Sequence, residues 1–290
     1  MNNNWFDRLV KIFDRDMVCH YTGEENVLSI LKDKQIRFSP FWKFDDPRES
    51  KQWNFDFIGA EQKHCYENYK KVLSDFDNLI KNKCRILAFC GWNNEEMNFQ
   101  NNAIPPYRQD YYRVGFTKSR MWSQYGDKHK GACLVFSRKK LEEQFMSTFE
   151  GNKKFTGRVE YQYHLESFVV ARKINCRNII EHGINKALEM QLDKFYHEYF
   201  FLKMMDYRDE HEYRLGVIVD DGVSVCLPIE SSLEGVIVGV DFPKEKYGDI
   251  NALAKNCSHN VQTFVLDWQE GRPQLMNLWE FIRTKSGFNL

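Results

Sequence analysis

Acidic and basic side chains alternate in the segment Glu210-His211-Glu212-Tyr213-Arg214, where the chain enters a predicted strand. The period of two in a strand places Glu210, Glu212 and Arg214 on one face. Neighbouring carboxylates raise each other's pKa and a guanidinium lowers it, so this pattern suits a tuned acid or base. A surface ladder of salt bridges is the structural alternative. The density of charge favours a catalytic role.

The segment His20-Tyr21-Thr22 lies at the end of a predicted strand over Met17–Tyr21 and at the start of a predicted helix. A ring nitrogen of His20 can bind a ribose hydroxyl or a phosphate, and Thr22 can donate from a helix N-terminus. Thr22 and Glu25 also form a capping-box pattern. For this segment alone, a capping Thr22 and a His20 bonded in the core is the favoured interpretation.

Carboxylates gather again at Asp45-Asp46-Pro47 and Glu49. Such a turn can hold a metal ion or orient a substrate hydroxyl. The structural alternative is that Asp45 and Asp46 accept hydrogen bonds from their own loop backbone, as Asp commonly does in turns. The structural use is slightly favoured.

Aromatic and basic residues meet in the segment from Met121 to Gly131. Helical spacing places Trp122 and Tyr125 on one side, and the loop that follows offers Lys128 and His129. An aromatic platform beside a basic turn suits a planar base joined to phosphates. A core aromatic pair followed by a solvated turn is the structural alternative.

The elements that must position these residues point to a mixed α and β protein. The 290 residues are 42% hydrophobic, which predicts a packed core rather than disorder. Helix-like and strand-like segments alternate without repeats. We expect an α+β fold in which residues 1–290 form one domain around a mostly antiparallel or split sheet flanked by helices. Helical insertions are predicted at 60–82 and 178–204, and an exposed loop at 93–110.

Local signals locate several further elements. Buried strands are predicted at Arg85–Phe89 and Ala132–Phe136 because both are apolar runs. The strands Glu212–Val219 and Val223–Leu227 are expected to form a hairpin, since Asp220-Asp221-Gly222 between them ends in Asp-Gly.

Composition and missing motifs narrow the function classes. The 41 basic residues balance the 41 acidic ones, so no global field favours nucleic acid or a membrane. No long apolar segment suggests a signal or a span, so the protein is expected to be soluble and cytoplasmic, without membrane contact. The fingerprints of P-loop ATPases, Rossmann dehydrogenases and α/β-hydrolases are absent from the sequence.

Taken together, the four segments resemble a bacterial family known as domain of unknown function 2971, over about residues 18–240. The family usually has Asn where this chain has Asp45, and often Trp where it has Tyr207. The family name implies no established activity, although such families occur in bacterial antiviral defence and toxin loci.

A second and more distant resemblance concerns chemistry. The strand ending at His20, the helix around Glu25–Lys32 and the strand Gln35–Ser39 are similar to the opening of ADP-ribosyltransferase-like folds, which place His, Tyr and Glu around NAD. The resemblance implies that His20 binds the adenine-side ribose and that Tyr125 or Tyr21 stacks on nicotinamide.

The same resemblance implies that Glu212 holds the nicotinamide ribose and that Glu210 orients the attacking nucleophile. The residues expected to contact the nucleotide are then Tyr21, Thr22, Trp122, Lys128, His129 and Arg214. The leading hypothesis is an NAD-consuming enzyme, acting by ADP-ribosyl transfer or by NAD hydrolysis. NAD is the expected substrate, a protein or nucleic acid the acceptor, and no metal is expected.

Two alternatives stay open at the level of sequence. A metal-dependent nuclease or phosphoesterase would use the acids Asp45, Asp46, Glu49, Glu210 and Glu212 around a divalent ion. Lys128 or His129 would then contact phosphate. The other alternative is a non-catalytic sensor, in which Trp122 and Tyr125 form the surface that recognises a nucleotide or a partner protein.

Overall fold

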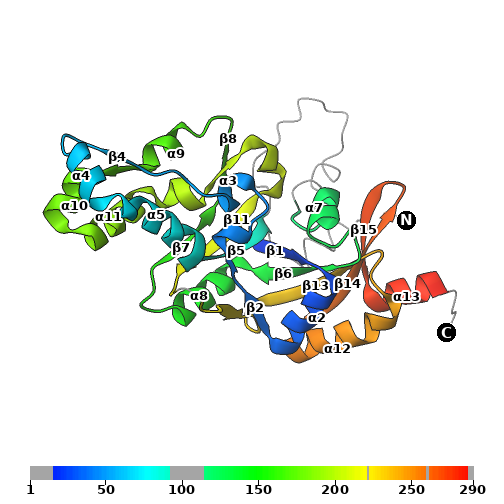
Figure 1. The fold of residues 1–290 in the computed structure, drawn as a ribbon. Coiled ribbons are helices and arrows are strands. Elements are labelled where there is room, and N and C mark those ends of the chain that lie inside the picture. The colour runs from blue at the N-terminus through cyan, green and yellow to red at the C-terminus, as the bar shows by residue number, and fades with distance from the viewer. Residues whose placement is uncertain (1–15, 92–113, 221, 259–260, 287–290) are drawn as a thin grey trace.

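A nine-stranded sheet runs through the part of the chain that the computed structural model describes, residues 16–91, 114–220, 222–258 and 261–286 (Figure 1). Its order is β15-β14-β13-β6-β1-β5-β11-β7, and β3 also pairs with β5. The strands are β1 (Met17–Thr22), β3 (Ser39–Pro40), β5 (Cys84–Gly91), β6 (Ala132–Ser137), β7 (Lys154–Arg158), β11 (Glu212–Ile218), β13 (Leu233–Gly239), β14 (Gln262–Gln269) and β15 (Arg272–Asn277). Neighbouring strands are antiparallel except β13 and β14. The predicted α+β class is confirmed.

The centre of the sheet explains where a cavity can form. β1 pairs with β6 along all six of its residues, but with β5 only at Val18 and Cys19. Further along, β5 pairs with β3 instead, at Arg85 and Ile86. The sheet is therefore split between β1 and β5 beyond Cys19. This split is the feature of the fold that positions the candidate site.

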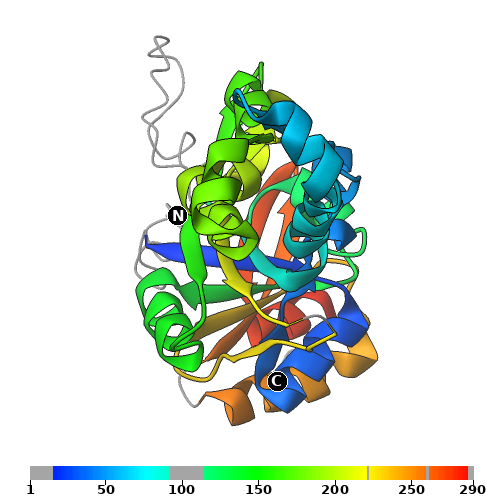
Figure 2. The ribbon, with the colours of Figure 1, turned by 60° about the vertical axis from the view of Figure 1, so that its left-hand side comes forward.

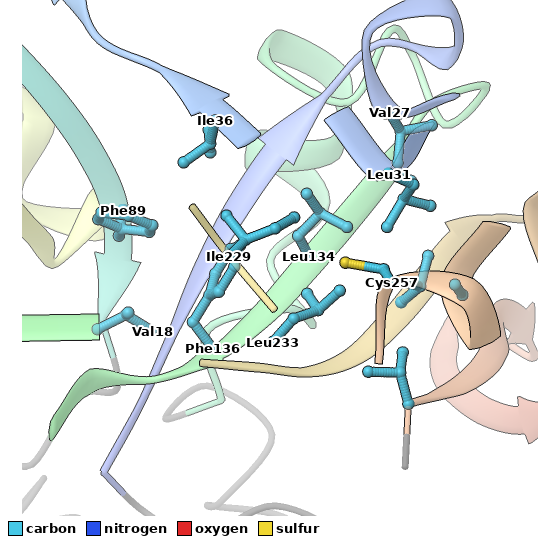
Figure 3. Packing of buried hydrophobic residues seen from close by; sticks show 14 of the residues in the cluster. Val18, Val27, Leu31, Ile36, Phe89, Leu134, Phe136, Ile229, Leu233 and Cys257 are labelled. Carbon is cyan, nitrogen blue, oxygen red and sulfur yellow. The ribbon is translucent and has the colours of Figure 1, made fainter. Parts of the chain in front are cut away.

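One face of the sheet is covered by helices whose apolar stripes face it. These are α2 (Glu24–Asp33), α8 (Arg138–Thr148), α12 (Tyr247–Cys257) and α13 (Leu278–Ser286). Val27 and Leu31 lie one helical turn apart on α2 and pack in the same buried cluster as Leu134 and Phe136 of β6 (Figure 3). On the opposite face, α7 (Ser119–Gln124) adds Trp122 to a second cluster.

A helical unit with its own core lies beside β5, β11 and β7 (Figure 1). Its elements are η1 (Phe41–Lys43), α3 (Pro47–Ser50), α4 (Gln62–Tyr69), α5 (Lys71–Asn78), η2 (Leu79–Lys83), α9 (Glu166–Ala171), α10 (Cys176–His182) and α11 (Ile184–Phe200). Figure 2 shows these helices in front of the sheet. Helix is thus found across the predicted insertion at 60–82.

Within the described part of the chain, three short strand pairs lie outside the main sheet. They are β2 (Gln35–Arg37) with β12 (Cys226–Pro228), β4 (Asp56–Ile58) with β9 (Lys173–Asn175), and β8 (Glu160–Gln162) with β10 (Leu202–Met204). The remaining short helices are η4 (Met205–Glu210) and η5 (Lys244–Lys246). In the described residues, no helix is long and apolar enough to cross a membrane.

Two local predictions are wrong because tertiary pairing overrides a local signal, and a third is right only in part. Thr22 is paired with Ala132 as the last residue of β1, and Gly23 takes the N-cap position of α2. The predicted helical insertion at 178–204 is helical as far as Phe200, but Gly183, with φ of 79°, separates α10 from α11, and the strand β10 replaces helix at its end. The predicted Asp-Gly hairpin does not form, because β12 pairs with β2 instead of β11. The loop predicted at 93–110 lies outside the described residues.

Candidate active site

A cavity of about 220 Å³ opens at the split between β1 and β5. This volume is below the roughly 300–1,000 Å³ of common small-molecule sites, so the cavity encloses only part of a dinucleotide. Its lining residues are Cys19, His20, Tyr21, Arg37, Ser39, Lys43, Phe44, Asp45, Asp46, Glu49, Ile86, Leu87, Ala88, Phe89, Cys90, Met121, Tyr125, Lys203, Glu210 and Glu212.

Three predicted residues from distant parts of the chain, His20, Tyr125 and Glu212, line this one cavity. They do not project from the same face of the sheet. Cys90 pairs with both Cys19 and Glu212, so these three side chains share a face, and His20, adjacent to Cys19, points to the other. His20 and Glu212 therefore contact the cavity from opposite faces, across the split.

His20 presents a hydrogen-bond acceptor to the cavity. Its Nδ1 lies 3.1 Å from the carbonyl oxygen of Ala88, and since a carbonyl only accepts, Nδ1 carries the hydrogen. Burial lowers the pKa of His20, against the opposing effect of the Ala88 bond, so the ring is neutral at pH 7. Nε2 of this tautomer can accept a hydrogen bond from a hydroxyl.

Glu212 is buried and held by two cations. Arg214 binds it through both Nε and Nη2, at 2.6 and 2.9 Å, and Lys203 Nζ lies 2.8 Å from Oε2. Burial opposes ionisation, but Arg214 and then Lys203 outweigh it and lower the pKa of Glu212. Glu212 is therefore a carboxylate at neutral pH. Oε2 accepts from both cations, and Oε1, which accepts only from Arg214, retains a lone pair for a ligand.

Glu210 reaches the same cluster by a route that the strand pattern did not predict. It ends η4, and β11 begins only at Glu212, because His211 between them has a left-handed backbone with φ of 44°. Lys203 Nζ nevertheless donates to Glu210 at 2.9 Å, so Lys203 bridges both acids. Tyr125 donates its hydroxyl hydrogen to Glu210 at 3.0 Å.

Lys203 and Tyr161 are site residues that sequence reasoning missed. They lie opposite each other in the β8–β10 pair. The Tyr161 hydroxyl accepts from the backbone N–H of Glu212 at 2.8 Å, while Lys203 binds its carboxylate. Lys203 stands alone in the apolar run Phe200-Phe201-Leu202-Lys203-Met204-Met205. A charge inside such a run predicts a buried partner of opposite sign.

The predicted turn of acids also reaches this cavity. Asp46 caps α3, and its Oδ1 accepts from the backbone of Arg48 at 2.8 Å, which confirms the structural interpretation of Asp46. Glu49 is fully buried and lies 2.7 Å from Arg214 Nη1. Burial, and next the charge of Glu49, raise the pKa of Asp46. Asp45 is exposed and lines the cavity.

Glu49, Glu210, Glu212, Lys203 and Arg214 form one buried group, named here the acid cluster. It holds three carboxyl groups and two basic groups in contact. Arg214 lies behind the cavity wall and also donates to the carbonyl oxygen of Phe200 at 2.7 Å. Arg48 also contacts Glu49, at 3.3 Å, so three bases balance the three acids of the cluster. Glu212, which lines the cavity, is the carboxylate placed to stabilise a positive charge on a bound molecule.

The predicted aromatic platform is divided between packing and the cavity. Trp122 is fully buried and donates its indole hydrogen to the carbonyl oxygen of Phe116, so it is a core residue and offers no recognition surface. Tyr21 packs edge-on against Trp122, and its hydroxyl donates to Gly115 at 2.6 Å. Thr22 is buried in β1. Of the predicted pair, only Tyr125 lines the cavity.

The loop that follows lies away from the cavity lining. Asp127, Lys128 and His129 are three consecutive residues with positive φ, between 48° and 70°. The His129 ring stacks on Trp122 and meets Trp268 edge-on. Lys128 is exposed and, like His129, absent from the cavity lining. The predicted phosphate contacts of this loop are not positioned for the cavity.

Two cations at the cavity edge were also missed by sequence reasoning. Arg37 on β2 and Lys43 on η1 are both exposed and line the cavity. Lys43 lies over the ring of Trp42. They give the opening two groups of the kind that bind phosphate, although the exposed Asp45 lies at the same edge.

Residues 121–215, or 95 of the 290 residues, match the model of a family described as protein of unknown function (DUF2971). The matched segment contains Tyr125, Lys203, Glu210, Glu212 and Arg214, and His20 and the Asp45–Glu49 turn lie outside it. No curated protein and no solved structure shows significant similarity to this chain. The resemblance inferred from the sequence is thus supported over this segment, and nothing supports a relation to ADP-ribosyltransferases.

The described residues hold no group of three or more His, Cys, Asp or Glu side chains arranged to bind a metal ion. The acids of the cavity are paired instead with Lys203 and Arg214. The arrangement offers carboxylate acceptors and a neutral imidazole inside, with cations at the opening. These groups can bind sugar hydroxyls and stabilise positive charge beside them.

Proposed function

We propose that the protein cleaves the N-glycosidic bond of NAD, releasing nicotinamide and passing ADP-ribose to water or to another acceptor. The observation that supports this most is the meeting of His20, Tyr125 and Glu212 in one cavity at the split of the sheet. These are the residue types expected around NAD. They come from three separate segments of the chain.

The acid cluster suits the electronic demand of this reaction. As the bond from C1′ to the nicotinamide nitrogen breaks, its electron pair leaves with nicotinamide and positive charge develops on the ribose. A buried carboxylate beside the sugar stabilises that charge strongly, because little water screens it. Glu212 has a lowered pKa and stays ionised for this purpose.

The remaining groups take complementary roles in the proposal. Glu210 orients the attacking hydroxyl, and the Tyr125 hydroxyl holds Glu210 in place. His20, on the other face of the sheet, accepts from a hydroxyl of the second ribose. A new bond from C1′ to the nucleophile's oxygen completes the reaction, and the proton lost by that oxygen passes to Glu210 or to solvent.

The test is nicotinamide release from NAD by the purified protein, followed by chromatography. Glu212→Gln is expected to lower the rate about 100-fold or more, since it removes the charge but keeps the shape. Glu143→Gln, an exposed acid on α8, is the matched control and should match the wild type. No release from the intact protein, or equal release from Glu212→Gln, would refute the proposal.

A further inference from the structure

Two buried acceptors at the cavity lack a donor. Asp46 Oδ2 and Glu49 Oε2 are both inaccessible to solvent and have no hydrogen-bond partner among the described residues. Asp46 is 5% exposed and Glu49 is 0% exposed, and both line the cavity. Lys203 Nζ is 4.0 Å from Glu49 Oε2, beyond hydrogen-bond distance. Buried carboxylate oxygens are rarely left in this state.

The other oxygen of each carboxylate already has a structural partner. Asp46 Oδ1 caps α3, and Glu49 Oε1 contacts Arg214 and Arg48. The protein thus fixes both carboxylates from one side and leaves the second oxygen of each without a donor. A bound molecule that supplies two hydroxyl hydrogens would satisfy both once each carboxylate turns its second oxygen toward the cavity that it lines.

From this geometry we infer that Asp46 and Glu49 form a subsite for the vicinal hydroxyls of a ribose, so that the site selects ribosides over 2′-deoxyribosides. The inference deepens the proposed function and rests on it for the identity of the full substrate. At these two oxygens a sugar diol fits better than a phosphate, because a phosphate would bring further acceptors to them. The nearby donors without a partner in the described part of the chain, Nε and Nη1 of Arg48, belong to a residue outside the cavity lining.

Asp46 allows an unusually clean substitution. Asn is as good an N-cap as Asp, so Asp46→Asn retains an oxygen for the backbone of Arg48. The change replaces the unpaired oxygen with an amide donor. Asp46→Ser also keeps the cap and removes the second oxygen, and it serves if Asn disturbs the fold. Asp249→Asn, an exposed acid in the first turn of α12, is the matched control.

The experiment measures binding of ribose 5-phosphate and 2-deoxyribose 5-phosphate by calorimetry, with urea midpoints as the check on folding. The wild type and Asp249→Asn should bind the ribose sugar about 10–100-fold more tightly, as expected for a hydrogen bond to a charged acceptor. Asp46→Asn should lose most of this preference while its urea midpoint stays near that of the wild type.

Equal binding of the two sugars by the wild type, no binding of either, or a preference that survives in both Asp46 variants would overturn the inference. Nicotinamide release from NAD is measured separately on the same proteins. A ribose preference that depends on Asp46, without release from NAD, would keep the subsite and refute the proposed function. Release from NAD without such a preference would keep the proposed function and refute the subsite.

Discussion

Two segments lie within the residues that match the family model, Glu210–Arg214 and Trp122–Gly131. Both are rich in charged and aromatic residues, but they have different roles in the structure. The first brings Glu210, Glu212 and Arg214 into the buried acid cluster beside the cavity. The second buries the Trp122 ring and continues into a loop whose Lys128 is exposed, and of its residues only Tyr125 lines the cavity. Both segments are dense in hydrogen bonds.

The difference lies in what burial does to free energy. Burying the Trp122 ring stabilises the fold, so packing alone accounts for it. Burying a carboxylate or a guanidinium is unfavourable unless it is paired, and apolar residues of similar volume often serve stability equally well. The stability of the fold therefore accounts for the burial of Trp122 in the segment Trp122–Gly131, but it does not account for the burial of the acid cluster. This asymmetry favours a functional role for the first segment, Glu210–Arg214, and a structural role for the second, Trp122–Gly131.

The largest expected effect tests the pairing in the acid cluster. Arg214→Met leaves Glu212 and Glu49 buried without their guanidinium, so the free energy of unfolding should fall by about 3–5 kcal/mol in urea titrations. Lys140→Met, which breaks the exposed pair with Glu234, should cost less than about 1 kcal/mol. Equal losses in the two variants would remove the distinction between the cluster and an ordinary surface pair.

A pH series tests the same cluster through Glu212. Against opposing burial, Arg214 and Lys203 lower its pKa to about 2, from 4.5 for the free side chain. A lowered pKa stabilises the folded state above pH 4.5, and this contribution is lost as the pH falls toward 2. The free energy of unfolding of the wild type should exceed that of Glu212→Gln by roughly 2–3 kcal/mol at neutral pH.

That difference should shrink steadily when urea unfolding is repeated from pH 5 toward pH 3. Glu143→Gln, which changes an exposed acid, should show little difference from the wild type at any of these values. A gap between wild type and Glu212→Gln that stays constant over the series would show that Glu212 is not held as a carboxylate by its two cations.

In the segment Trp122–Gly131, stability should instead depend on the space around its backbone. A Cβ at Gly131 would collide with the carbonyl oxygen of Thr22, so Gly131→Ala should destabilise the fold by about 1–3 kcal/mol at any pH between 5 and 8. Gly248→Ala is the matched control on α12, where a Cβ meets nothing within 4 Å. It should be neutral or stabilise by up to about 1 kcal/mol. A tolerated Gly131→Ala would contradict the packing role.

Local patterns predicted much of the frame and eight of the residues that line the cavity, namely His20, Tyr21, Asp45, Asp46, Glu49, Tyr125, Glu210 and Glu212. The apolar runs of β5 and β6 read as strands because both faces of the central sheet are buried. His20, Tyr125 and Glu212 could be selected by chemical type and by their place at the ends of predicted elements.

Other features depend on pairing between distant segments, which a single sequence does not display. Lys203 was expected at the end of a long helix, yet it lies on a strand whose parallel partner β8 is about 40 residues earlier. Arg37 and Lys43 carry no local mark that separates them from other exposed cations. Glu210 lies beside Glu212 as predicted, but it gets there through a left-handed turn at His211 and not by sharing a strand face with Glu212.

The smallest expected effect tests whether Tyr125 has a packing role like Trp122 or a chemical role together with Glu210. It stands in the aromatic segment but donates to Glu210 in the acid cluster. Tyr125→Phe should lower the free energy of unfolding by only about 1 kcal/mol, because the ring stays in place and Glu210 keeps Lys203. Nicotinamide release should nevertheless fall about 10-fold, since Glu210 loses the bond that orients it.

Tyr163→Phe, at a residue that is 70% exposed, is the matched control and should change neither quantity. Unfolding in urea and the rate of nicotinamide release, measured on the same preparation, separate the two roles of Tyr125. A loss of stability without a loss of rate would group Tyr125 with Trp122, as packing. A loss of rate at nearly unchanged stability would place it with Glu210, and the boundary between structural and chemical residues would then fall between positions 122 and 125 of a single short helix and its cap.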